Sequence, residues 1–329
     1  MSYPAPKGTI RGTHHLTFCV GGAQEDYDFH VKTLGLKMVK KTVLFDGEVP
    51  IYHLYYGNEV GNASTLLTSF PYRQAGWMGK RGTQQARFLN LSVPADSIGF
   101  WADRLKGAGI AVTETERFGT QRLEFEHPSG PEYALIADAD DDDRKPYEGG
   151  GVTAENAIRG AHGTTTFIRD LDTAKVFLVD GMGGEYLGQD GQYHQFQIGN
   201  DEGYGRILEM KEERDLDQGS WTFGEGTIHH HAFDVIDGEN QMVVREHLVG
   251  LGFTDASEPK DRGYFYSVYC RSPMGLLCEL AWSHEKGFYI DEQPEQLGTS
   301  IQIPPHWEHR RPEISQLEEI ATVESIDAP

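Results

Sequence analysis

A helix-like segment that ends at a glycine recurs four times along this chain of 329 residues. The closing glycines, Gly35, Gly109, Gly183 and Gly252, lie 74, 74 and 69 residues apart. Glycine adopts the left-handed conformation that ends many helices without steric cost, so it marks each helix end. A regular period indicates that one supersecondary unit has been repeated, and this repeat constrains the fold more than any single motif.

The four units share their order of elements. Each opens with a strand-like run, namely THHLTFCV, ARFLNLSV, GTTTFIRD and HHHAFDV. Runs rich in aliphatic and aromatic residues follow the helix, such as IYHLYYG in the first unit and YFYSVYC in the fourth. Each unit is therefore a βαβββ module, which forms a curved sheet with one helix-covered face and one concave face. We predict an α+β fold in which four modules build two cup-shaped half-barrels.

The spacing of the modules divides the chain into four parts. We expect a first pair of modules over 8–137 and a second pair over 156–285. Between them, 138–155 contains the run DADDDD followed by proline and glycines, which is typical of a solvated linker. The repeat ends near residue 285, so 286–329 is predicted to be a C-terminal tail, in which His306 and His309 are peripheral.

Composition limits the partners of the protein. The formal net charge of −22 would repel a phosphate backbone and an anionic membrane surface, so we expect no nucleic acid and no membrane as partners. No apolar run approaches membrane-spanning length, and MSYPAPKG lacks the apolar stretch of a signal peptide. Three cysteines are too few for a disulfide framework. A cytoplasmic location is the simplest interpretation, and the composition is compatible with a homo-oligomer.

Two histidines occupy matching positions in the repeat. When the opening strands are aligned, His15, Phe88, Thr164 and His230 fall at one equivalent position, so only the first and fourth units have histidine there. Alternate residues of a strand share a face, and small neighbours such as Thr17 and Ala232 would leave room beside these rings. Strand histidines such as His53, His162 and His194 are more often packed, hydrogen-bonded residues than ligands.

A carboxylate on the last strand of the fourth unit is the third candidate for a metal ligand. Glu279 interrupts an apolar run, where burial is costly unless a cation or a donor meets the charge. Its position matches Glu209 in the third unit and Ala134 in the second, whereas the corresponding stretch of the first unit, GNASTLLTSF, contains no carboxylate.

Two imidazoles and one carboxylate form the facial triad of non-haem iron(II) sites, which leaves coordination positions for a substrate and dioxygen. A site for a redox-inert metal would use a further carboxylate, so its absence from the first unit favours iron. Because His15 lies in the first module and His230 and Glu279 lie in the fourth, these two modules must pair around the metal. The second and third modules then form the other cup.

These segments resemble a known family. The βαβββ quartet is similar to the vicinal oxygen chelate superfamily, and the stretches THHLTFCVGG, TLLTSFPYR and DRGYFYSVYCRSP resemble hydroquinone and chlorohydroquinone 1,2-dioxygenases. The resemblance extends over most of 10–285 and includes the Glu279 strand. It implies iron(II) held by His15, His230 and Glu279, and it implies four further functional residues, which are His14, His229, Arg262 and Tyr269.

All four of these further assignments have competing interpretations. Strict alternation along a strand would send His14 and His229 away from the metal unless a bulge turned them inward. Arg262 could instead form a surface ion pair with Asp261 or Glu258. His231, next to the predicted ligand, is a polar residue where the family usually has an aliphatic one.

Tyr269 could instead pack on Phe265 as an ordinary aromatic residue. The resemblance implies an Fe(II)-dependent extradiol-type dioxygenase that opens a small aromatic diol, hydroquinone or a chlorinated hydroquinone, with O2 as co-substrate. The alternatives are a catechol-type extradiol dioxygenase, a glyoxalase-like metal-dependent lyase or isomerase, and a non-enzymatic protein that binds aromatic compounds.

Overall fold

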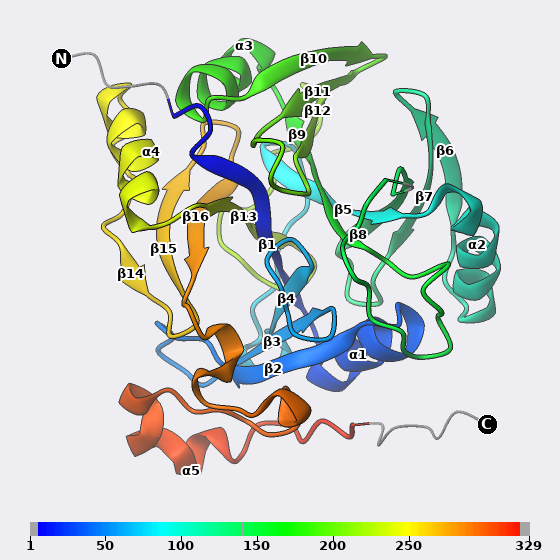
Figure 1. The fold of residues 1–329 in the computed structure, drawn as a ribbon, viewed down its shortest axis with the longest axis vertical. Coiled ribbons are helices and arrows are strands. Elements are labelled where there is room, and N and C mark those ends of the chain that lie inside the picture. Colours follow the sequence, from blue (N-terminus) through cyan, green and yellow to red (C-terminus); the bar gives the residue numbers. More distant parts are fainter. Residues whose placement is uncertain (1–5, 140, 323–329) are drawn as a thin grey trace.

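The computed structural model describes residues 6–139 and 141–322, so residue 140 of the predicted linker lies outside the described part. Two strongly curved eight-stranded sheets lie side by side (Figure 1). The strand order is β14-β15-β16-β13-β1-β4-β3-β2 in the first sheet and β10-β11-β12-β9-β5-β8-β7-β6 in the second. The first sheet thus combines the first and fourth modules and the second sheet combines the second and third, which confirms the predicted pairing.

The elements of the first two modules follow the predicted order. Module one contains β1 (Ile10–Val20), α1 (Ala23–Tyr27), the π-helix η1 (Asp28–Thr33), β2 (Lys37–Val43), β3 (Tyr52–Gly57) and β4 (Leu66–Pro71). Module two contains β5 (Gln85–Val93), α2 (Ile98–Gly107), β6 (Thr113–Arg117), β7 (Thr120–Glu126) and β8 (Glu132–Ala137).

Modules three and four repeat the pattern. Module three contains β9 (Gly160–Ile168), α3 (Leu171–Lys175), the π-helix η4 (Val176–Gly181), β10 (Glu185–Asp190), β11 (Tyr193–Gln197) and β12 (Ile207–Glu212). Module four contains β13 (Ile228–Val235), α4 (Gly238–Gly250), β14 (Lys260–Asp261), β15 (Phe265–Arg271) and β16 (Leu277–Ser283). In the tail, a 3-10 helix (Pro305–Arg310) leads into α5 (Arg311–Ile314).

Glycine ends each module helix, as the repeat predicts. The φ angles of Gly35, Gly109, Gly183 and Gly252 are 70°, 78°, 73° and 100°, which all lie in the left-handed region. The helices of modules one and three differ from the expectation because their second halves are π-helical, and the hydrophobic period alone gave no sign of this change.

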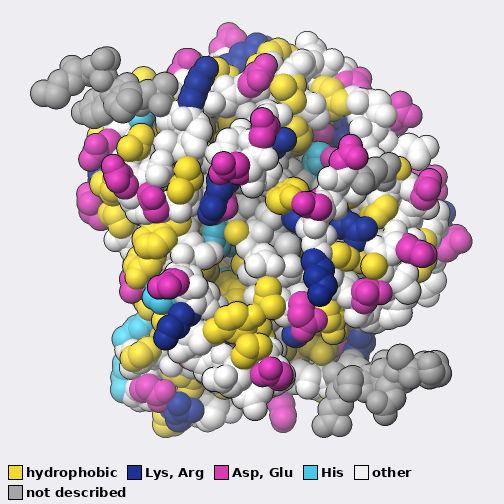
Figure 2. Space-filling view, viewed as in Figure 1, with side chains coloured by type: hydrophobic (Ala, Val, Ile, Leu, Met, Phe, Trp, Pro, Cys, Tyr) yellow, Lys and Arg dark blue, Asp and Glu magenta, His cyan; other side chains and the backbone are white. Residues whose placement is uncertain are grey.

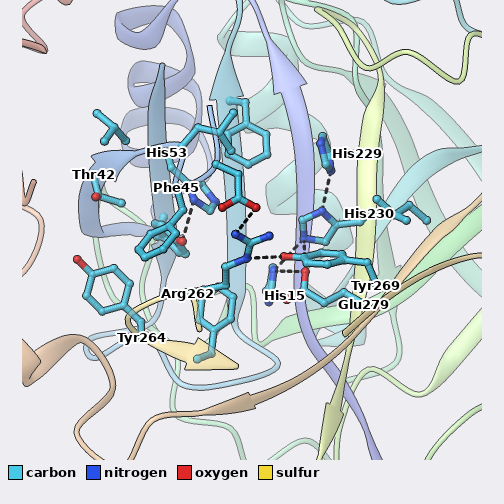
Figure 3. A pocket seen from close by; sticks show the side chains of 17 residues that line it. His15, Thr42, Phe45, His53, His229, His230, Arg262, Tyr264, Tyr269 and Glu279 are labelled. Carbon is cyan, nitrogen blue, oxygen red and sulfur yellow. Dashed lines mark hydrogen bonds and ion pairs between the residues drawn. The ribbon is translucent and has the colours of Figure 1, made fainter. Parts of the chain in front are cut away.

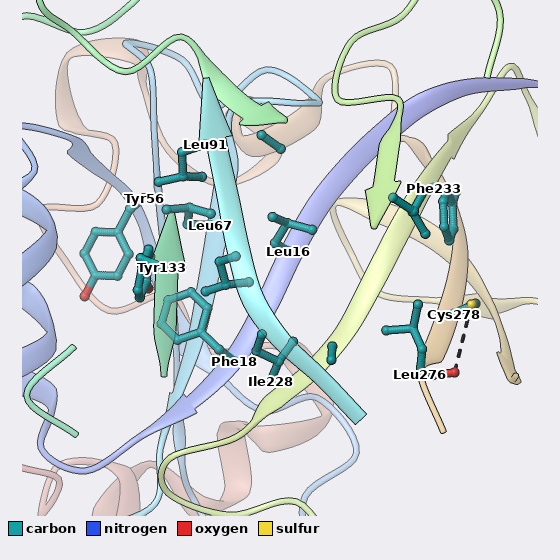
Figure 4. Packing of buried hydrophobic residues seen from close by; sticks show 14 of the residues in the cluster. Leu16, Phe18, Tyr56, Leu67, Leu91, Tyr133, Ile228, Phe233, Leu276 and Cys278 are labelled. Carbon is teal, nitrogen blue, oxygen red and sulfur yellow. Dashed lines mark hydrogen bonds between the residues drawn. The ribbon is translucent and has the colours of Figure 1, made fainter. Parts of the chain in front are cut away.

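Apolar side chains fill the space between the two sheets. Leu16 and Phe18 of β1 alternate with the polar residues that face the concave side, and both are fully buried. They pack in one cluster with Leu91 of β5 and Ile228 of β13 (Figure 4). The sheets therefore contact each other through their convex faces, which leaves the concave face of the first sheet free to form a site.

His231 connects the two sheets. Its Nε2 lies 2.8 Å from the Thr13 hydroxyl of β1, and its Nδ1 lies 3.0 Å from the Thr164 hydroxyl of β9. Burial lowers the pKa of His231 to about 3, so the ring is neutral and can donate through one nitrogen and accept through the other. It therefore points away from the concave face and does not compete with His230 for a metal.

The outer surface agrees with the acidic composition. Figure 2 shows acidic side chains distributed over this face of the molecule rather than gathered in one patch. None of the helices in 6–139 and 141–322 combines the length and the apolar character needed to cross a bilayer.

The predicted acidic linker contains a buried cation, Arg144. Its guanidinium donates hydrogen bonds to the carbonyl oxygens of Ser64 and Ala161, at 2.9 and 3.0 Å.

Candidate metal centre

Two β-bulges turn both histidine pairs toward the same side of the first sheet. In the antiparallel ladder of β1 and β13 the register shifts between Thr13 and His15 and again opposite His230, so His14 and His229 are the extra residues. A bulge breaks the alternation of side chains and re-aims one of them. This resolves the conflict between strict alternation and the predicted roles of His14 and His229.

His15, His230 and Glu279 converge on the concave face (Figure 3). The Nε2 atoms of the two histidines lie 3.0 Å apart. Oε2 of Glu279 lies 2.9 Å from His230 Nε2 and 3.6 Å from His15 Nε2. All three residues are buried, and Glu279 Oε2 has no hydrogen-bond donor among the described residues. An unpartnered buried carboxylate oxygen beside two imidazole nitrogens is a donor set that fits a divalent metal.

The electrostatics of the three side chains suit metal binding. Burial lowers the pKa of His15 well below its ordinary value, which keeps the ring neutral and its lone pair free. Burial alone would raise the pKa of Glu279, but His15, His230 and a hydrogen bond from Ser267 lower it to about 2. A neutral imidazole and an ionised carboxylate are the forms that ligate metals. At neutral pH these side chains therefore have few protons to release when a metal binds.

The first histidine of each pair supports the second. His14 Nδ1 lies 2.9 Å from Nδ1 of His15, and His229 Nδ1 lies 2.8 Å from Nδ1 of His230. A hydrogen bond at Nδ1 places the proton there and leaves Nε2 unprotonated, facing the centre of the group. Ser283 holds the other side of the His14 ring at 2.9 Å. The two HH pairs thus form two equivalent units of one inward and one supporting ring.

A mostly apolar cavity of about 260 Å³ opens beside the three convergent residues. His229, Arg262 and Tyr269 line it, whereas His14 is not among the described lining residues. A small aromatic ring suits this volume, because pockets for larger ligands exceed about 300 Å³. The apolar part of the wall consists of Val43, Leu44, Phe45, Phe70, Phe265 and Leu277.

Arg262 belongs to the cavity and not to the outer surface. Its Nε donates to the Tyr269 hydroxyl at 3.3 Å, and its Nη1 forms an ion pair with Asp46 at 2.6 Å. The proposed surface partners Asp261 and Glu258 are not its partners among the described ion pairs. Burial raises the pKa of Tyr269 far above its ordinary value, so its hydroxyl stays protonated.

The C-terminal tail holds one wall of the cavity. The carbonyl oxygen of Phe45 accepts hydrogen bonds from His306 Nε2 at 2.9 Å and from Trp307 Nε1 at 3.0 Å. Arg310 donates to the carbonyl oxygen of Glu48 in the same loop, at 2.6 Å. His306 is therefore less peripheral than the sequence indicated, since it contacts a residue that lines the cavity.

The second sheet has the same bulges but different side chains. Its register places Phe88 and Gly163 at the positions of His15 and His230, so the assignment of Thr164 to this position was wrong by one residue. The bulge, which the sequence does not display, caused the error. Arg87 and His162 take the places of the supporting histidines. No metal-binding group forms there among the described residues.

Glu209 of the second sheet is neutralised by protein cations. It occupies the position of Glu279, and Arg122 binds it through two hydrogen bonds of 2.9 and 2.8 Å. Arg117 adds a third contact at 3.2 Å. A bidentate guanidinium thus provides the positive charge that a metal would provide to Glu279 in the first sheet.

Asp26, His30 and His127 form a second buried cluster, but its hydrogen bonds oppose metal binding. His30 Nδ1 faces the Asp26 carboxylate at 3.1 Å and the Asp26 carbonyl at 2.9 Å, so this nitrogen carries a proton. His127 Nδ1 accepts from the Ser129 amide at 2.9 Å, so Nε2 holds its proton and faces Asp26 at 3.4 Å. Each ring therefore faces the carboxylate with an N–H group and not with the lone pair that a metal would need. The cluster is a structural hydrogen-bond network.

The fold and this His–His–Glu group define the class as a protein of two curled sheets of βαβββ modules with a candidate metal centre on one concave face. No family model matches the chain. The chain is 39% identical over 307 residues to the chlorohydroquinone/hydroquinone 1,2-dioxygenase of Sphingobium indicum, and it covers 95% of that protein and 93% of itself. It is 33% identical to MhqO of Bacillus subtilis, provisionally assigned as a ring-cleaving dioxygenase, with coverage of 93% and 95%.

Solved structures agree with these relatives. The crystal structure of a Bacillus subtilis protein, provisionally assigned as a dioxygenase, matches with a TM-score of 0.88 and 31% identity, over 97% of this chain and 100% of that one. Glyoxalase I from Zea mays shares the fold, with a TM-score of 0.61 and 16% identity over 82% of this chain and 92% of that one. The chain belongs to the family of ring-cleaving dioxygenases that contains these relatives.

Two substitutions should separate metal binding from stability. Glu279→Gln is expected to weaken ferrous ion binding at least about 100-fold, because changes to supporting residues alone cost about 10- to 100-fold. Without metal its free energy of unfolding should be unchanged or raised, since a buried charge is removed. His231→Leu should retain metal. Its free energy of unfolding should fall by about 1–3 kcal/mol, because two buried hydrogen bonds are lost. Metal analysis and urea unfolding of both variants would measure these effects. Retained metal in Glu279→Gln, or lost metal in His231→Leu, would contradict the assignment of the ligands.

Asp26→Asn should lower the free energy of unfolding by about 3 kcal/mol at pH 7 and leave the metal content unchanged. Burial would raise the pKa of Asp26, but His30 and His127 lower it below its ordinary value. This stabilisation is present above the unfolded-state pKa of about 3.9 and is lost as the pH falls toward the folded-state pKa. The difference between the two proteins should therefore shrink below about pH 4 in urea titrations. Parallel loss of metal would identify the cluster as a ligand set instead.

Proposed function

We propose that this enzyme uses Fe(II) and O2 to open the ring of hydroquinone or of a chlorinated hydroquinone. The convergence of His15, His230 and Glu279 in a cavity sized for one small ring is the observation that carries the proposal. The name of the Sphingobium indicum relative supports the substrate class. Iron is favoured because two imidazoles and a single carboxylate form the facial triad typical of non-haem iron oxygenases.

The first module lacks the extra carboxylate that a redox-inert metal would favour. The register places Thr68 of β4 opposite Thr17, where the fourth module has Glu279 opposite Ala232. A hydroxyl is a much weaker metal ligand than a carboxylate, so only three side chains serve as strong ligands. This arrangement supports a site that receives substrate and dioxygen and is not closed by a fourth protein ligand.

The residues around the three ligands have distinct tasks in this proposal. A ferrous ion held by His15, His230 and Glu279 would supply the redox chemistry that couples dioxygen to the substrate. Arg262 places a fixed positive charge where negative charge develops on the substrate oxygens, in a cavity with little water to screen it. Tyr269 keeps its proton and donates a hydrogen bond or a proton to an oxygen atom. His229, which burial keeps neutral, accepts from His230 through Nδ1 and can donate its other ring N–H to a substrate oxygen.

His14 acts through His15. It does not line the cavity among the described residues, but its hydrogen bond fixes the tautomer of the ligand ring. A neutral ring held in this way presents Nε2 to the metal in one orientation, which limits the rearrangement needed on binding. His14 is therefore a positioning residue in this proposal, whereas His229 both positions His230 and contacts the substrate.

Oxygen uptake tests the proposal directly. The Fe(II)-loaded protein should consume one O2 for each hydroquinone or chlorohydroquinone opened, and catechol should react more slowly. Arg262→Ala and Tyr269→Phe should retain iron but lower kcat about 10²- to 10³-fold, the usual cost of removing such a group. The measurements are an oxygen electrode, ultraviolet spectra of the product and metal analysis. Turnover without oxygen uptake, or a preference for catechol, would contradict the assignment.

A further inference from the structure

The side of the cavity opposite the three ligands carries a hydrogen-bonded pair, His53 and Tyr55. Both residues lie on β3, line the cavity and are buried. The Tyr55 hydroxyl lies 2.8 Å from His53 Nδ1. Figure 3 places His53 across the cavity from His15, His230 and Glu279. Sequence reasoning treated His53 as a packed core residue, because nothing in the period of the repeat distinguishes it.

The pair is anchored to the sheet that carries the metal ligands. His53 Nε2 lies 3.1 Å from the Thr68 hydroxyl, which lies 2.7 Å from the Thr17 hydroxyl. Thr17 in turn lies 2.8 Å from His230 Nε2, next to the position of the metal. β3 is two strands from β1 in the sheet. At about 4.8 Å per strand, this is roughly 10 Å along the sheet, and the curl shortens the direct path.

The pair is neutral, and its hydrogen-bonding group for a ligand is the Tyr55 hydroxyl, because both ring nitrogens of His53 already have partners. Burial lowers the pKa of His53 well below its ordinary value and raises the pKa of Tyr55 well above its own. When His53 Nδ1–H donates to the Tyr55 oxygen, the Tyr55 hydroxyl can donate one hydrogen bond and accept another. A phenolic hydroxyl of a ligand has the same two needs, whereas a carboxylate or a cation does not.

We propose that the Tyr55 hydroxyl, held in place by His53, binds the second hydroxyl of a para-diol whose first hydroxyl lies at the metal. This selects a para-diol over catechol, whose two hydroxyls are adjacent and would both lie at the metal end. The inference rests on the proposed function for the orientation of the ring. It identifies a specificity-determining residue, Tyr55, that contacts substrate on the side away from the metal ligands.

Two other polar residues of the cavity have partners of their own. Asp46 forms ion pairs with Arg262 and Lys260, at 2.6 and 3.5 Å. The Tyr264 hydroxyl donates to Asp291 at 2.8 Å, outside the group that lines the cavity.

The second sheet provides an internal comparison. Its register places Arg122 at the position of His53, and the guanidinium there binds Glu209. The equivalent position in the first sheet carries a smaller, uncharged ring. A charged residue there would require a buried counter-ion, so an imidazole suits a cavity that must accept a neutral phenol.

Binding measurements with two ligands test the inference. Dissociation constants of hydroquinone and of phenol, which lacks the second hydroxyl, would be measured without oxygen by calorimetry on the Fe(II)-loaded protein. Wild-type protein should bind hydroquinone more tightly. Tyr55→Phe and His53→Leu should weaken hydroquinone binding about five- to tenfold, the effect of one hydrogen bond, and change phenol binding less than about twofold.

Tyr264→Phe is the matched control, because it removes a hydroxyl from the cavity wall whose partner is Asp291. It should leave the ratio of the two dissociation constants unchanged. Iron content and thermal unfolding would show that each variant is folded and loaded, and the conservative Tyr55→Phe keeps the test available if His53→Leu does not fold. Equal losses for both ligands, or no loss, would overturn the inference. Absence of oxygen uptake with hydroquinone would instead overturn the proposed function, because the binding ratio is measured without turnover.

Discussion

The antiparallel ladder between β1 and β13 is the interaction on which the rest of the site depends. It brings together strands from modules one and four, more than two hundred residues apart, and places His15 and His230 on one concave face. Two of its three register shifts turn His14 and His229 to the same side, where each ring holds the outer nitrogen of its neighbour. A regular ladder would bury one histidine of each pair in the opposite face. The irregularities of the sheet are therefore as important to the metal centre as the ligands themselves.

The two sheets show how one architecture serves two purposes. In the first sheet, Glu279 has an unpartnered oxygen that faces two neutral imidazoles, an arrangement that is costly without a cation. In the second sheet, two hydrogen bonds from Arg122 neutralise the charge of Glu209, so this carboxylate does not require a metal cation. The sheets pack through their convex faces, and His231 is hydrogen-bonded to a threonine of each. The two pairs of modules therefore share one architecture but differ in what neutralises their buried glutamate.

Much of this arrangement follows from the sequence because repetition makes distant positions comparable. The closing glycines such as Gly35, the pairing of the outer modules and the convergence of three potential ligands all follow from aligning the four units. The bulges do not, since an extra residue in a ladder leaves no periodic signal, and the misplacement of Thr164 has the same cause. His53 and the contacts of the tail with Phe45 were also missed. They depend on how strands curl and on which loop a tail reaches, and both are properties of the packed chain.

We propose that three protein side chains hold one ferrous ion, with the remaining positions available to substrate and dioxygen. Anomalous diffraction at the iron edge, from crystals loaded with Fe(II) without oxygen, tests it most directly. The account predicts one strong peak within about 2.3 Å of His15 Nε2, His230 Nε2 and a carboxylate oxygen of Glu279, with no fourth protein ligand. A peak at Asp26, or a fourth side chain bound to the metal, would contradict it.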